Sequence, residues 1–69
     1  MAYENHWLPG FSFNVEEWFE GDQYETLVIC RSFAVARAVF DTAIAEKPAD
    51  YFTIRQRIRV VKKHPEGDW

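Results

Sequence analysis

Apolar and polar side chains alternate along residues 11–19, FSFNVEEWF. Phe11, Phe13, Val15 and Phe19 point to one side, while Ser12, Asn14, Glu16 and Trp18 point to the other. A period of two is typical of a β-strand with one buried face. This pattern predicts a first strand whose phenylalanine side belongs to the core.

A turn signal follows that strand. Gly21 stands at the first central position of a two-residue turn, Gly21-Asp22, which is typical of a type II′ hairpin. The hairpin predicts a second strand over about residues 23–30. In this register Val15 lies opposite Val28, and Leu27 and Ile29 lie on the other face beside Glu16 and Trp18.

The spacing changes to that of a helix at residues 33–47. Ser32 is a good N-cap residue, and Pro48 ends the helix because the residue before a proline avoids helical geometry. Arg37 and Asp41 are four residues apart and can pair. One apolar stripe is expected along the helix, formed by Ala36, Val39, Phe40, Ala43 and Ile44.

Alternation returns over residues 52–61, which predicts a third strand. Its apolar face comprises Phe52, Ile54, Ile58 and Val60, and its other face Thr53, Arg55, Arg57, Arg59 and Val61. Gln56 interrupts the apolar face without an evident reason. Residues 62–69 are expected to be a tail, in which His64 is solvated, and residues 1–9 an arm.

The predicted fold is therefore α+β, with the order β-β-α-β in a single domain of residues 1–69 and a core of residues 10–61. A right-handed crossover through the helix places the third strand beside the first. The expected sheet is three-stranded and antiparallel, in the order 2-1-3, with the helix packed on the phenylalanine face.

Composition adds a charge asymmetry. The chain has 69 residues and a net charge of -3, with 17% aromatic residues to support a small core. Residues 1–30 carry six acidic residues and no Lys or Arg, whereas residues 51–69 carry five basic residues and two acidic ones. This asymmetry indicates either a charged partner or two ends that neutralise each other in the fold, and we favour the second.

No catalytic or metal-binding pattern is present in the sequence, so we expect neither an enzyme nor a cofactor. Glu16 and Glu17 are neighbours on a strand and point to opposite faces. His6, His64 and Cys30 lack metal-ligand spacing, and Cys30 is expected in the core. A single cysteine, no apolar run of membrane-spanning length and no signal-peptide pattern predict a cytoplasmic protein that does not enter membranes.

The sheet face opposite the helix is the predicted partner-binding surface. We expect it to combine Trp18, Leu27, Ile29, Glu16, Glu20, Arg55, Arg57 and Arg59. Aromatic, aliphatic and arginine side chains on a rigid sheet are enriched at protein interfaces. The alternative is structural, with arginines covering Trp18 and pairing with the glutamates.

Two other interpretations of the charges remain open. The arginine strand beside an aromatic residue resembles a stacking platform for single-stranded nucleic acid, although a negative net charge disfavours nucleic-acid binding. Conversely, the acidic first half could imitate nucleic acid and occupy the basic groove of a protein.

The segments VEEWFEGD, ARAVFDTAIAEKP and IRQRIRVV resemble short uncharacterised proteins of alphaproteobacteria and their phages with a β-β-α-β pattern. In profile the chain is similar to anti-CRISPR inhibitors, which bind CRISPR effector subunits and block target-DNA binding or nuclease recruitment. The resemblance implies a non-enzymatic, monomeric or weakly dimeric protein-binding inhibitor in the host cytoplasm. The alternatives are a nucleic-acid-binding protein using Arg55, Arg57 and Arg59, or a bacterial accessory or adaptor protein.

Overall fold

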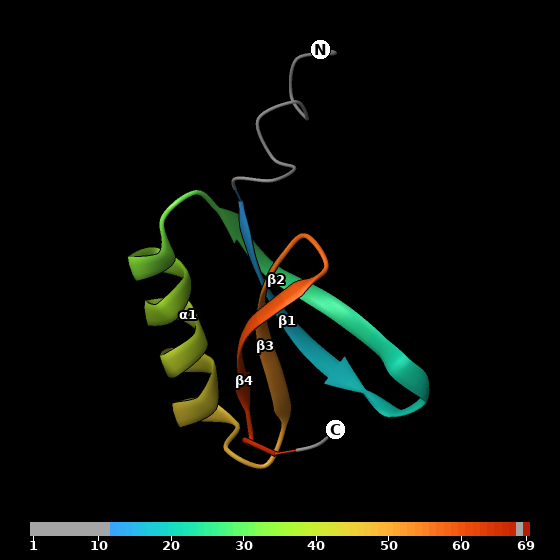
Figure 1. The fold of residues 1–69 in the computed structure, drawn as a ribbon. Coiled ribbons are helices and arrows are strands. Elements are labelled where there is room, and N and C mark those ends of the chain that lie inside the picture. Colours follow the sequence, from blue (N-terminus) through green and yellow to red (C-terminus); the bar gives the residue numbers. More distant parts are fainter. Residues whose placement is uncertain (1–11, 68) are drawn as a thin grey trace.

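The computed structural model describes residues 12–67 and 69, and it is an α+β fold in which one helix covers one face of an antiparallel sheet (Figure 1). The elements are β1 (Phe13–Phe19), β2 (Gln23–Cys30), α1 (Phe33–Glu46), β3 (Tyr51–Gln56) and β4 (Arg59–His64). The sheet has four strands in the order β2-β1-β3-β4. The α+β class is confirmed, whereas the three-stranded sheet is wrong because β4 adds an outer strand. The arm expected at residues 1–9 lies outside the described residues.

The β1–β2 hairpin differs from the predicted one at its turn. Three residues, Glu20–Asp22, form a short 3₁₀ turn, so Phe19 pairs with Gln23 and the expected two-residue turn is wrong. Gly21 and Asp22 both adopt positive φ, of 76° and 61°. Glycine and aspartate are among the residues that tolerate this conformation, which explains how the chain reverses here.

A β-bulge corrects the register farther along the hairpin. Glu16 pairs with Thr26 and Val15 with Val28, so Leu27 is the extra residue in β2. Beyond the bulge the predicted pair of Val15 with Val28 is confirmed, and Phe13 pairs with Cys30. Leu27 itself lies beside Val39 and Ala43 of α1, so its predicted place on the face opposite the helix is wrong.

The expected third strand is two strands joined by a hairpin. The chain reverses at Arg57 and Ile58, with Arg57 at a φ of 57° and Ile58 95% exposed. Gln56 therefore ends β3 and pairs with Arg59, which accounts for its interruption of the apolar pattern. Residues 62–64, expected in a tail, belong to β4, and His64 Nε2 donates a hydrogen bond to the carbonyl oxygen of Pro48.

The helix follows the prediction. The Ser32 side chain accepts from the Val35 amide as the N-cap, and Arg37 pairs with Asp41 at 3.2 Å. The buried core joins helix and sheet through Val15, Ala36, Phe40, Phe52 and Ile54. Cys30 packs against this core, as expected. No helix of the described residues has the length and apolar character to cross a membrane.

Candidate functional site

A buried carboxylate organises the sheet face opposite the helix. Glu16 has no exposed surface, although it points away from the helix. Its Oε2 accepts from Arg55 Nη2 at 2.6 Å, and its Oε1 accepts from Thr53 Oγ1 at 3.3 Å. A buried charge is tolerated when it is paired and hydrogen-bonded, and both carboxylate oxygens are satisfied in this way.

Two aromatic side chains complete what we call the Glu16 network: Glu16, Trp18, Tyr24, Thr53 and Arg55. Trp18 Nε1 donates to Thr53 Oγ1 at 2.8 Å, and its ring lies 4.7 Å from that of Tyr24. Arg55 donates to the Tyr24 hydroxyl at 3.2 Å and lies over its ring. Desolvation lowers the pKa of Arg55, but its hydrogen bonds to Glu16 and Tyr24 outweigh this effect, and the pKa is raised overall.

The structure brings together only part of the predicted binding surface. Glu16, Trp18 and Arg55 meet in the network, and Ile29 lies on the same face opposite Asn14. The predicted arginine ladder is wrong, because Arg57 is in a turn and Arg59 pairs with Gln56 on the helix side of the sheet. Glu20 lies in the β1–β2 turn, and Leu27 lies on the helix side.

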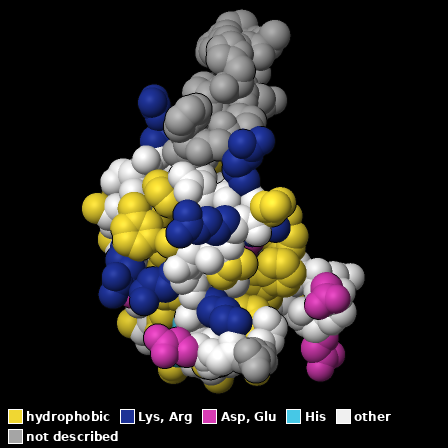
Figure 2. Space-filling model, viewed as in Figure 1, with side chains coloured by type: hydrophobic (Ala, Val, Ile, Leu, Met, Phe, Trp, Pro, Cys, Tyr) yellow, Lys and Arg dark blue, Asp and Glu magenta, His cyan; other side chains and the backbone are white. Residues whose placement is uncertain are grey.

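The displaced arginines belong to a basic hairpin, which we define as Arg57, Arg59, Lys62 and Lys63 on β3–β4. Ile58, Val60 and Val61 are exposed on the same hairpin. Figure 2 shows Lys and Arg side chains gathered over the viewed face, with acidic side chains at the lower right, where the β1–β2 hairpin ends in Figure 1, and a further acidic group at the lower left. Among the described residues, the two charge signs therefore concentrate at different hairpins.

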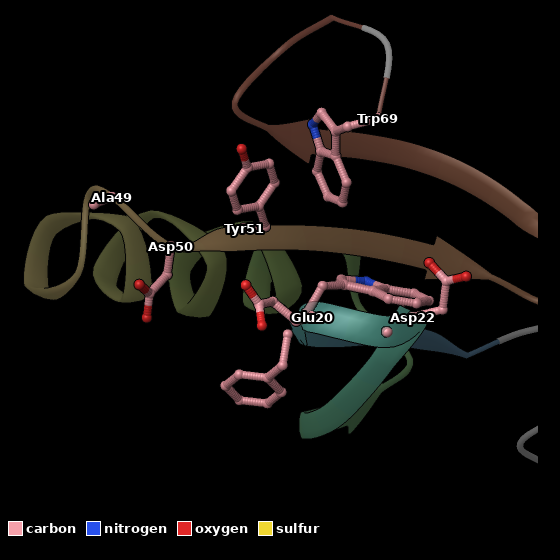
Figure 3. Close-up of a pocket in the computed structure, with 9 residues that line it drawn as sticks. Glu20, Asp22, Ala49, Asp50, Tyr51 and Trp69 are labelled. Carbon is pink, nitrogen blue, oxygen red and sulfur yellow. The ribbon is translucent and has the colours of Figure 1, made fainter.

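The opposite end of the sheet carries an acidic pocket. It is lined by Trp18, Phe19, Glu20, Gly21, Asp22, Ala49, Asp50, Tyr51 and Trp69. Tyr51 and Trp69 stand on one side of it, and the carboxylates of Glu20 and Asp22 project from the hairpin turn on the other (Figure 3). The sequence predicted Glu20 and Trp18 as binding residues but gave no sign that Trp69 would join them, because its position depends on β4.

Trp69 is held in this pocket by contacts with the end of the sheet. Its ring packs edge-to-face against Tyr51 at 4.8 Å, and its Nε1 donates to the carbonyl oxygen of Pro65. Lys63 Nζ lies 5.6 Å from the centre of the ring. The indole is thus placed by β3 and β4 and remains 43% exposed.

A second buried carboxylate, Glu17, lies on the helix side of the sheet, where it pairs in register with Phe52. It is 6% exposed and lies 3.8 Å from Lys47. A hydrogen bond with the Asp50 side chain and burial raise the pKa of Glu17 above its usual range, against the lowering effect of Lys47. Two carboxyl groups that share a hydrogen bond favour the protonated state of one of them.

This arrangement gives a pH-dependent stability. Because the pKa of Glu17 is higher in the folded than in the unfolded chain, the fold gains stability from its protonation at low pH. That gain is lost as the pH rises from about the ordinary pKa of 4.5 through the raised folded value. We expect Glu17→Gln to be more stable than the wild type at pH 7 and to lose this advantage toward pH 4.

Urea denaturation of both proteins at several pH values measures the difference in their free energy of unfolding. Because the other carboxylates titrate in both proteins, their contribution cancels in this difference. Glu20→Gln, at an exposed turn position, is the matched control, and its difference from the wild type should not follow this pH profile. A Glu17→Gln protein that is less stable than the wild type at pH 7 contradicts the assignment.

Within the described part of the chain, no group of three or more His, Cys, Asp or Glu side chains could hold a metal ion. No family model, curated protein or solved structure matches this chain, so the comparisons assign it to no family. The candidate site therefore comprises three parts: the Glu16 network, in which Arg55 Nε is buried without a hydrogen-bond partner among the described residues, the basic hairpin and the acidic aromatic pocket.

Proposed function

We propose that this protein is a small non-enzymatic inhibitor that binds another protein through the acidic end of the β1–β2 hairpin. The observation that carries the proposal is the meeting of exposed aromatic rings with exposed carboxylates around one pocket. Aromatic side chains are enriched in protein interfaces, and complementary charges direct association with a partner. The partner surface that fits is a basic one.

The hairpin end is favoured over the predicted surface around Trp18 and Arg55 because its charges are available. Arg55 and Glu16 neutralise each other at 2.6 Å within the network. Glu20 and Asp22 are both exposed, and among described residues they have no ion pair within 4.0 Å. An unpaired exposed carboxylate contributes its full field to an approaching cationic surface.

The class of partner that we propose is a CRISPR effector complex in the host cytoplasm. What supports this choice is similarity of profile: a small, acidic, single-domain protein without a catalytic pattern is typical of anti-CRISPR inhibitors. An effector binds its nucleic acids in positively charged channels. An acidic hairpin that occupies such a channel excludes target DNA, and no catalytic group is needed for this inhibition.

The test uses purified CRISPR effector complexes loaded with guide RNA. We expect the protein to reduce target-DNA binding in a mobility-shift assay, and the double variant Glu20→Gln/Asp22→Asn to be weaker by about tenfold. Asparagine tolerates the positive φ of Asp22, so the turn is retained. The control Glu46→Gln/Glu66→Gln removes the same charge at exposed positions elsewhere and should inhibit as the wild type does.

The proposal fails if neither target-DNA binding nor target cleavage is reduced in any effector tested at micromolar protein. It also fails if both double variants weaken inhibition equally, because the effect then follows net charge and not the hairpin end.

A second candidate function, nucleic-acid binding, is favoured by the basic hairpin. Arg57, Arg59, Lys62 and Lys63 lie on one hairpin, whereas Glu20 and Asp22 lie on the other. Binding of this kind weakens steeply with salt. It requires a single-stranded oligonucleotide to bind at low salt and the variant Arg57→Ala/Arg59→Ala to bind less well, and no binding at low salt excludes it.

A further inference from the structure

The acidic pocket has the composition of a site for an organic cation. Aromatic faces carry negative electrostatic potential and attract a cation placed over them, and carboxylates at the rim add hydrogen-bond acceptors. Trp18, Tyr51 and Trp69 supply rings, while Glu20 and Asp22 supply carboxylates from the facing turn (Figure 3). The pocket is open and has a volume of about 860 Å³, enough for an entire side chain.

One contact within the molecule already uses this chemistry. The ammonium of Lys63 lies 5.6 Å from the ring centre of Trp69, within the range of a cation–π interaction. The Trp69 ring therefore already contacts one positively charged group of this protein. Lys63 is not among the residues that line the pocket, so the pocket itself is open to a second cation.

We propose that the pocket binds the side chain of an arginine residue of the protein partner. A guanidinium is planar, stacks on aromatic rings and donates up to five hydrogen bonds, so it can contact an indole and two carboxylates at once. An ammonium matches the charge but not the stacking. This inference rests on the proposed function, because it identifies the residue of a basic partner that enters the hairpin end.

The shape of the turn supports an arginine that enters between the rings and the carboxylates. Gly21 lines the pocket with no side chain, and Asp22 follows it at positive φ. The carboxylates of Glu20 and Asp22 flank this glycine on the hairpin turn. A guanidinium between these carboxylates and the rings of Tyr51 and Trp69 has acceptors on one side and aromatic side chains on the other (Figure 3).

The experiment is an NMR titration of the ¹⁵N-labelled full chain with Nα-acetyl-arginine methylamide. We expect shifts in the amides of residues 19–22 and 49–51 and in the indole N–H of Trp69. The citrulline analogue, which has the same shape without the charge, should bind at least about fivefold more weakly, and the lysine analogue should also bind more weakly.

Two variants locate the site. Trp69→Leu and Glu20→Gln/Asp22→Asn should each weaken the arginine analogue by about fivefold. The matched control Glu46→Gln/Glu66→Gln should bind as the wild type does. Amide shifts elsewhere in the sheet confirm that each variant is folded.

The inference is overturned if citrulline binds as well as arginine, if the shifts lie outside the pocket, or if neither variant weakens binding. This result is separable from that of the proposed function. If the wild type inhibits an effector but the arginine analogue does not bind in the pocket, only the arginine site is contradicted. If the analogue binds in the pocket but no effector is inhibited, the proposed function is contradicted.

Discussion

Arg55→Ala is expected to lower the free energy of unfolding by about 3 kcal/mol, which is the scale for removing one partner of a buried ion pair. The cause is Glu16, which has no exposed surface and would lose its 2.6 Å contact with Arg55. A domain of this size has a total stability of about 3–5 kcal/mol, so the variant should retain at most about 2 kcal/mol. Urea denaturation followed by circular dichroism measures the loss.

The neighbouring arginine gives the matched control. Arg57→Ala changes an exposed turn residue and should alter the stability by less than about 0.5 kcal/mol. The double variant Glu16→Gln/Arg55→Met should recover part of the loss, since it removes the unpaired charge together with its partner. Equal effects of Arg55→Ala and Arg57→Ala would contradict the Glu16 network as the source of stability.

Phe40→Ala is expected to have the largest effect on stability, with a loss of about 3–5 kcal/mol. Phe40 is 2% exposed and is the largest buried side chain that α1 contributes to the core. Its removal leaves a cavity between the helix and the buried residues Val15, Phe52 and Ile54 of the sheet. The expected result is a chain without cooperative thermal unfolding, observed by calorimetry or by near-ultraviolet circular dichroism.

Ile58→Ala is the control for Phe40→Ala. Ile58 is 95% exposed at the β3–β4 turn, and its truncation should change the midpoint of urea denaturation little. Sequence periodicity placed both residues on apolar faces, whereas the structure buries only Phe40. Comparing the two variants therefore tests the structure against the sequence pattern. A loss at Ile58 as large as that at Phe40 contradicts the hairpin.

Local signals in the sequence were sufficient for the helix. Ser32 and Pro48 fix its two ends, and the stripe that includes Ala36 and Phe40 is the one that packs on the sheet. The α+β class and the neighbouring positions of the first three strands followed from alternation and from the right-handed crossover. These features depend on contacts between residues that are close in the sequence, or on general rules of chain handedness.

The candidate site was less predictable because it depends on two irregularities. Residues 52–61 contain no glycine or proline, so only the interruption at Gln56 marks the reversal at Arg57, where an arginine adopts a positive φ of 57°. Without that reversal the arginines would form a ladder on one face. The sequence pattern does not indicate the bulge at Leu27 either. One extra residue in β2 compensates for the longer turn, so the pairing beyond the bulge is the same as for a regular hairpin with a two-residue turn.

We expected the arginines of residues 51–69 to be neutralised by the acidic residues of the first half of the chain, and this is the case for one of them. Arg55 pairs with Glu16, while Arg57 and Arg59 are exposed at the other hairpin. The residues that complete the network, Thr53 and Tyr24, carry no signal of their own. They could be identified only from the register that places both on the face of Glu16.

The bulges in β2 and β4 have a consequence for the behaviour of this protein at high concentration. Both strands lie at the margins of the sheet, and each contains one residue out of register, Leu27 and Val61. A strand of another molecule cannot continue a regular ladder past such a residue, and Lys62 and Lys63 repel a second copy of β4. A chain with apolar residues exposed at its margins is thereby protected against growth into aggregated sheets.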